Sequence, residues 1–92
     1  MVRVITLDLF IPGAETIKDK RQVIKSLVEK IRHKFNVSIA ETGYHDLWQR
    51  SQLELACVAN ESTHLNEVQQ AILKLIESLY PVEITNLSVA DY

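Results

Sequence analysis

Acid, base and imidazole groups gather in one short stretch of the chain, which holds Glu41, His45 and Asp46. An imidazole beside a carboxylate is a common proton-transfer pair, so an acid and a general base could act together here. Adjacent residues in a turn rarely point at one place, however, and residues of these types commonly stabilise hairpin turns. We therefore expect Glu41, His45, Asp46 and Arg50 to have a structural or recognition role, and we predict no catalytic residue and no enzymatic activity.

The other residues that could do chemistry stand alone in the sequence. Cys57 lies in an apolar run with no adjacent basic residue, which favours a buried structural thiol over a nucleophile. His33 and His64 lack a paired spacing, so a metal site has little support. The two glycines are isolated, and they do not form a phosphate-binding loop. We expect neither a metal nor a cofactor, and no small-molecule substrate is indicated.

The length and composition are those of one small globular domain over residues 1–92, with 47% hydrophobic and 24% charged residues. One cysteine offers no intrachain disulfide and fits a reducing compartment. The N-terminal apolar run is broken by Arg3, Thr6 and Asp8, and no stretch approaches the roughly 18 apolar residues of a membrane helix. We therefore expect a soluble, cytoplasmic protein without a membrane partner.

The first half of the chain predicts a strand followed by a long helix. Residues 2–11 alternate with period two and are rich in β-branched and apolar types. Residues 17–35 repeat apolar positions at helical spacing, with Thr16 as the predicted N-cap and Asp19 in the first turn. At about 100° per residue, Lys20 leans toward the core side of this helix. We expect its stem to cover apolar neighbours and its ammonium group to hold a carboxylate.

Two further strands are predicted by alternation over residues 37–42 and 52–59. Gly, His and Asp between them suit a hairpin around residues 43–46. Counting by twos along the second of these strands puts Arg50 on one sheet face and Glu41 on the other. A direct salt bridge between Glu41 and Arg50 should therefore not form unless a bulge shifts the register.

The rest of the chain predicts a second helix and a closing strand. Ser62 or Thr63 can cap the helix, which should end before Pro81, and a strand over residues 82–89 follows, with a bulge or break at Asn86. The order is then βαββαβ. Short connections and right-handed crossovers favour an α+β, ferredoxin-like fold, with a four-stranded antiparallel sheet in the order 4-1-3-2 and both helices on one face.

The sheet face without helices is predicted to be apolar, which favours a partner on it. We expect a homodimer, with contributions from Phe10, Trp48, Ala56 and Val58. RNA bases could stack on such a face only if aromatic residues stood at paired positions on the two central strands. Phe10 and Trp48 do not supply that pattern, so base stacking of this type is disfavoured.

The predicted first helix carries most of the positive charge. Residues 17–35 hold seven of the ten basic residues and have a charge of +5, whereas the remainder has −7. Such a helix can simply be solvated, and Glu29 could neutralise its neighbours Lys25 and Arg32. Alternatively, an anionic partner such as RNA binds there. At about 100° per residue, four basic residues fall in one stripe: Lys18, Arg21, Lys25 and Arg32.

Four blocks of this sequence resemble a known family: Ile17-Lys18-Asp19-Lys20-Arg21, Ser26-Leu27, the run from Phe35 to Glu41, and the run from Asp46 to Arg50. They are similar to the YlxP family, also called domain of unknown function 503, over nearly the whole chain. The resemblance implies a bacterial cytosolic protein of ferredoxin-like fold. It also implies a family often encoded among translation and ribosome-maturation genes, with no established enzymatic activity.

From this resemblance and the charge pattern we expect a non-enzymatic binding protein associated with translation or ribosome maturation through RNA or ribosomal contacts. One alternative is a homo-oligomeric protein–protein adaptor that binds no RNA. The other is a small enzyme centred on residues 41–50.

Overall fold

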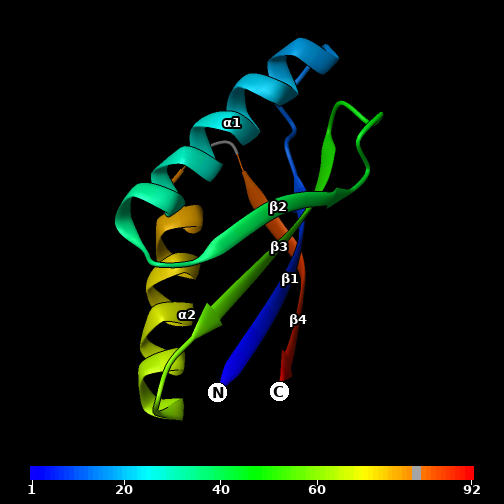
Figure 1. Cartoon of the computed structure of the whole chain (residues 1–92). Coiled ribbons are helices and arrows are strands. Elements are labelled where there is room, and N and C mark those ends of the chain that lie inside the picture. Colours follow the sequence, from blue (N-terminus) through cyan, green and yellow to red (C-terminus); the bar gives the residue numbers. More distant parts are fainter. Residues whose placement is uncertain (80–81) are drawn as a thin grey trace.

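The computed structural model describes residues 1–79 and 82–92 as a sheet with two helices on one face (Figure 1). The elements are β1 (Val2–Phe10), α1 (Ile17–Lys34), β2 (Ser38–Gly43), β3 (Arg50–Val58), α2 (Ser62–Glu77) and β4 (Glu83–Asp91). The antiparallel sheet has the order β2-β3-β1-β4, which is the predicted order read in reverse. The predicted βαββαβ arrangement is therefore confirmed. Neither α1 nor α2 is long and apolar enough to cross a membrane.

The core lies between the sheet and the helices. Burial alternates strictly along β1, so that Ile5, Leu7 and Leu9 face the helices and are at most 2% exposed. The apolar stripes of both helices pack against this row, through Leu27 and Ile31 of α1 and through Ile72 and Ile76 of α2. Alternate residues of a strand face one side of the sheet, and residues three to four apart share one face of a helix. The helices therefore pack with their apolar faces on the apolar side of the sheet.

The start of α1 is fixed by a reciprocal cap. The amide of Asp19 donates to Thr16 Oγ1 over 3.1 Å, and the amide of Glu15 donates to Asp19 Oδ2 over 3.1 Å. The predicted N-cap at Thr16 is confirmed. Such a cap satisfies amides that have no partner within the helix.

The start of α2 differs from the prediction. Glu61 occupies the N-cap position without a side-chain cap, and Ser62 is already helical. The predicted cap at Ser62 or Thr63 is wrong, because the amide of Leu65 bonds the Glu61 main-chain oxygen and closes the first turn earlier. Leu65, in this first turn, is 1% exposed.

Two irregularities interrupt the ladders. The β2–β3 register shifts between Glu41 and Gly43, which leaves Thr42 as an extra residue. The β1–β4 register shifts where Asp8 pairs with Asn86, and Thr85 is left out of the pairing. The predicted break thus falls beside Asn86, although β4 continues beyond the predicted strand, to Asp91.

Candidate functional site

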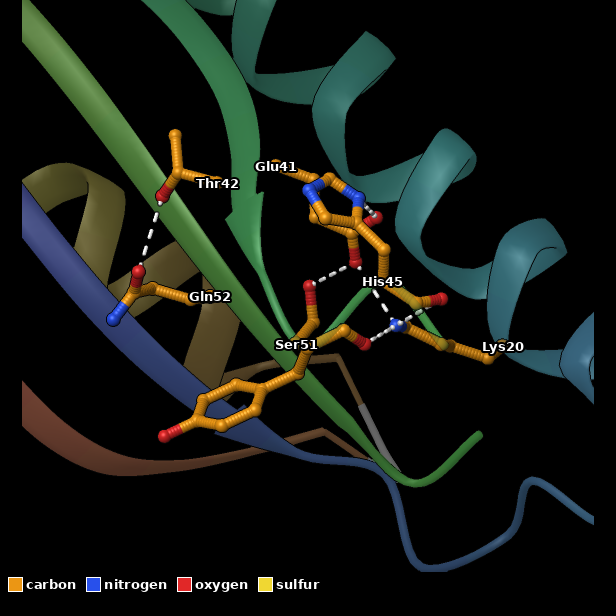
Figure 2. Close-up of polar contacts among 7 residues, drawn as sticks. Lys20, Glu41, Thr42, His45, Ser51 and Gln52 are labelled. Carbon is orange, nitrogen blue, oxygen red and sulfur yellow. Dashed lines mark hydrogen bonds and ion pairs between the residues drawn. The ribbon is translucent and has the colours of Figure 1, made fainter. Parts of the chain in front are cut away.

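A polar cluster joins the first turn of α1 to the β2–β3 hairpin (Figure 2). Lys20 is 1% exposed, and its Nζ lies 3.1 Å from Glu41 Oε2. The same ammonium group donates hydrogen bonds to the main-chain oxygens of Tyr44 and His45. An ammonium group has three protons, so these acceptors use its whole hydrogen-bonding capacity. Lys20 faces the core and holds a carboxylate, as its position in the helical pattern predicts.

Glu41 is the centre of this cluster. Ser51, which is fully buried, donates from Oγ to Glu41 Oε2 over 2.6 Å, and His45 Nδ1 lies 3.1 Å from Oε1. Burial by itself would raise the pKa of Glu41, but hydrogen bonds from Ser51 and Lys20, with the charges of Lys20 and His45, bring that pKa below its ordinary value. The carboxylate is therefore ionised at neutral pH and held on both oxygens.

Tyr44 turns the chain at the end of β2. Its φ is 59°, a left-handed conformation that is uncommon outside glycine. Its main-chain oxygen accepts hydrogen bonds from Lys20 and from the Leu47 amide, and its ring lies 5.6 Å from the Arg50 guanidinium carbon. Lys20 thus fixes the hairpin through its backbone as well as through Glu41.

The cluster contains the residue types of a proton-transfer site, but most of its polar groups are not accessible to a substrate. A general base must come within hydrogen-bond distance of a substrate proton. Ser51 and Lys20 are buried and already bonded to Glu41, and the His45 side chain, 62% exposed, is the member open to solvent. Within residues 1–79 and 82–92, no group of three His, Cys, Asp or Glu side chains could hold a metal ion. We interpret the cluster as a structural contact that holds the β2–β3 hairpin in place against α1.

The structure brings together two of the four residues predicted for hairpin recognition. Glu41 and His45 meet, whereas Asp46 is exposed and joins no ion pair in the described part of the chain. Arg50 pairs with Phe10 in the strand register, and Glu41 pairs with Leu53 on the helix-facing side. Glu41 and Arg50 thus lie on opposite faces, as the alternation predicts.

The four residues predicted for a dimer interface lie near two ends of the open sheet face. Val58, 71% exposed, pairs with Val2 at one end of β1, and Ala56 lies close by. Phe10 lies at the other end of β1, about 26 Å away at about 3.3 Å per residue. Trp48, 53% exposed, precedes β3 at that same end. These residues therefore form two small apolar areas instead of one.

The middle of the open face is polar. Gln52 Nε2 donates to Asp8 Oδ1 over 3.0 Å, and Thr42 Oγ1 donates to Gln52 Oε1 over 3.3 Å. Glu54 pairs with Thr6 and lies on the same face. The prediction of an apolar face overlooked the carboxylates of Asp8 and Glu54. The alternation of β1 and β3 assigns both of these residues to the open face.

The four basic residues predicted to contact RNA are exposed on α1: Lys18, Arg21, Lys25 and Arg32. In the described residues, none of the four takes part in an ion pair. The pairing by which Glu29 could neutralise Lys25 and Arg32 is therefore not formed in the described residues. Arg32 instead donates from Nη2 to the Ile39 main-chain oxygen over 2.9 Å, which ties it to β2.

A groove of about 780 Å³ beside α1 was not predicted. Its walls come from α1 and from Leu75 of α2, and they include Lys30, His33 and Lys34 together with the carboxylate of Glu29. The signal was present in the sequence, since these three residues follow the i, i+3, i+4 spacing of one helix face. With two lysines and one glutamate, the groove adds one net positive charge to the part of α1 that the predicted stripe does not cover.

Arg3 is the other residue that the sequence reasoning missed. It is 8% exposed and donates to both carboxylate oxygens of Asp91, over 2.7 and 2.9 Å. It also donates to Asn66 Oδ1 and Gln69 Oε1 of α2. The hydrogen bond from Arg3 lowers the pKa of Asp91, and the same bond raises the pKa of Arg3. The signal was an arginine at an inward position of an otherwise apolar strand face.

Comparison with known proteins agrees with this fold. Residues 2–89 match the family model described as protein of unknown function DUF503. The uncharacterized protein YlxP of Bacillus subtilis (strain 168) is 36% identical over 78 residues, which cover 85% of each chain. The de novo designed protein Foldit4 superposes with a TM-score of 0.65 over 100% of this chain and 99% of its own, at 13% identity.

A second designed protein, LFR1 1, is described as having a ferredoxin fold. It superposes with a TM-score of 0.57 at 12% identity and covers 98% of this chain and 81% of its own. At such low identities the designed proteins show the fold alone, and the predicted ferredoxin-like class is confirmed.

Proposed function

Since this chain belongs to the DUF503 family of proteins of unknown function, we propose that it is a non-enzymatic protein that binds RNA through α1 and acts in or near translation. The observation that carries this proposal is that most positive side chains of α1 have no carboxylate partner. Of its seven lysines and arginines, Lys20 is buried against Glu41, and the other six are exposed and join no ion pair in the described residues.

Cations without a carboxylate partner retain their charge for an external anion. Lys18 and Arg21 lie in the first turns of α1, where basic side chains oppose the helix dipole. That position costs the helix a little stability and favours a use outside the fold. Their spacing with Lys25 suits a phosphate backbone running along the helix, and the groove lined by Lys30 and Lys34 extends the positive surface.

A binding titration tests the proposal. Fluorescence anisotropy with a labelled single-stranded RNA of mixed sequence should show affinity falling with salt at a slope of about −0.7 per phosphate contacted. Lys18→Glu with Arg21→Glu should weaken binding and reduce the slope by about 1.4. The control is Arg50→Glu with Lys74→Glu, which changes the net charge equally on other surfaces. Salt-independent binding, or equal losses in both double variants, would contradict a site on α1.

The link to translation rests on the family resemblance and is tested separately. The tagged protein should be recovered from a bacterial lysate with ribosomal RNA or ribosomal particles, and RNase treatment should release it if RNA carries the contact. Recovery of a protein partner that survives RNase would instead favour an adaptor.

A homo-oligomeric adaptor without RNA binding is the second candidate, because Val58 is 71% exposed on a central strand. If the open face forms a contact, Val58→Glu should weaken it by placing an unpaired charge in a desolvated position. Light scattering that shows a monomer at micromolar and higher concentrations would contradict this candidate.

A further inference from the structure

The outer edge of β4 is open in the described structure. The sheet order places β4 beside β1 on one side and at the sheet edge on the other (Figure 1). The opposite edge, β2, has six residues, whereas β4 has nine. Both strands have one register shift, and in β4 it lies at Thr85, before the regular stretch from Asn86 to Asp91. Natural edges are commonly blunted by short length, bulges, lysine or proline, and residues 83–91 contain neither lysine nor proline.

The ladder shows which main-chain groups face outward. Val2 and Tyr92 exchange two hydrogen bonds, so they form a hydrogen-bonded pair. Such pairs alternate with non-hydrogen-bonded pairs in an antiparallel ladder. The pairs Arg3–Asp91, Ile5–Val89 and Leu7–Leu87 are therefore of the second type. The amides and carbonyls of Leu87, Val89 and Asp91 point away from β1, toward the open edge.

Apolar side chains accompany these open main-chain groups. Leu87 and Val89 pair with Leu7 and Ile5, so they lie on the helix-facing side of the sheet. They are nevertheless 40% and 42% exposed, whereas Ile5 and Leu7 are at most 2% exposed. An unprotected edge with exposed apolar side chains on one face favours the addition of another strand.

We propose that a second copy of this chain pairs with β4 edge to edge, antiparallel, about a two-fold axis at Ser88. Hydrogen-bonded pairs then form between Leu87 and Val89 of the partner subunit, and between Val89 and Leu87 of the partner subunit. The four apolar side chains meet on one face of the sheet. Asp91 faces Ile84 and the extra residue Thr85 of the partner subunit, at the register shift, and no like charges face each other.

The neighbouring registers are less favourable. A two-fold axis at Leu87 places Val89 opposite Ile84 of the partner subunit, across the extra residue Thr85, so the ladder is regular only from Asn86 to Ser88. An axis at Val89 places Asp91 opposite Leu87 of the partner subunit, a charged group against an apolar one. The register at Ser88 keeps a regular ladder from Asn86 to Ala90 and sets the apolar positions of this strand against one another, and this self-complementarity favours a second copy over an unrelated strand. This inference does not depend on RNA binding.

Disulfide trapping tests the register. Ser88 would lie directly opposite its counterpart in a non-hydrogen-bonded pair, where the Cα atoms are about 4.5 Å apart and a disulfide can form. In a Cys57→Ala background, Ser88→Cys should give a covalent dimer under mild oxidation. Asn86→Cys on the same strand, and Ala40→Cys on the opposite edge, should cross-link several-fold more slowly. Equal rates in all three variants, or no cross-link at position 88, would overturn the proposal.

The oligomeric state provides a second measurement. Light scattering of the unmodified protein should give twice the 10.5 kDa of one chain, and Leu87→Lys with Val89→Lys should return the mass to one chain. Circular dichroism of the variant checks that it remains folded. Amide exchange avoids mutation altogether, since the Leu87 and Val89 amides should become protected as concentration rises. A dimer that is lost with Val58→Glu but retained in the double lysine variant would place the contact on the open face and overturn β4 pairing.

Discussion

Lys20 Nζ lies 3.1 Å from Glu41 Oε2, with the two side chains 1% and 23% exposed. The pair joins the first turn of α1 to β2, and its two residues are 21 positions apart in the chain. Because Lys20 also bonds the backbone of the hairpin loop, one side chain holds both the carboxylate and the turn. The hairpin therefore depends on α1 for its position.

Lys20→Met should destabilise the fold. The substitution keeps the apolar stem but leaves the Glu41 carboxylate without its cation and the Tyr44 main-chain oxygen without a donor. Breaking a buried pair on one side costs about 3 to 5 kcal/mol, and the partial exposure of Glu41 reduces this to about 2 kcal/mol. Urea unfolding measures the change. Lys18→Met, exposed on the same helix, is the control and should change the free energy by less than about 0.5 kcal/mol.

The pKa shift of Glu41 predicts a pH-dependent stability. The pKa of Glu41 is lower in the folded protein, so its contribution is complete above the unfolded value of about 4.3 and is lost as pH falls through the folded pKa. Glu41→Gln should therefore be destabilising at pH 7, and its difference from the unmodified protein should shrink below about pH 4. Urea unfolding at several pH values checks this. A difference that stays constant with pH would show that the charge of Glu41 contributes nothing.

The fold was predictable because its signals are periodic. Burial along β1 alternates as the sequence does, and the Thr16 cap lies one residue before α1. The same arithmetic placed Lys20 toward the core and Glu41 on the helix-facing side. The identity of the carboxylate that Lys20 meets could not be read from the sequence, because it depends on how the β2–β3 hairpin folds back on α1.

Other contacts escaped prediction because they join distant segments. Arg3 and Asp91 are 88 positions apart, and the closing strand was predicted to end before Asp91. The Glu29 pairing failed for a different reason. Arg32 can reach either a carboxylate on its own helix or the Ile39 carbonyl of β2, and only the tertiary structure decides between these acceptors.

Arg32 should therefore behave differently from the other three residues of its stripe. Arg32→Gln removes a hydrogen bond from a charged donor to the β2 backbone and should cost about 1 kcal/mol of stability. Lys25→Gln, exposed and without such a contact, should cost less than about 0.5 kcal/mol. Thermal or urea unfolding of the two variants provides the comparison. Equal stabilities would indicate that the Arg32 contact contributes nothing in solution.

Arg3→Gln should loosen the end of β4 while the rest of the sheet remains paired. Arg3 is the common partner of Asp91, Asn66 and Gln69, and a glutamine is too short and has too few donors to replace it. A guanidinium is not deprotonated in proteins, and the hydrogen bond with Asp91 raises the pKa of Arg3 further.

The measurement for this last prediction is hydrogen exchange at single amides. The Tyr92 amide, which bonds the Val2 main-chain oxygen, should exchange faster in Arg3→Gln, whereas amides between β1 and β3 should keep their rates. Arg50→Gln, on the open face, is the matched control and should leave Tyr92 unaffected. If the β4 edge also pairs two copies, the same variant should weaken that dimer, because Asp91 would no longer be held in line with the strand. An unchanged Tyr92 exchange rate would mean that β4 is held by its ladder alone.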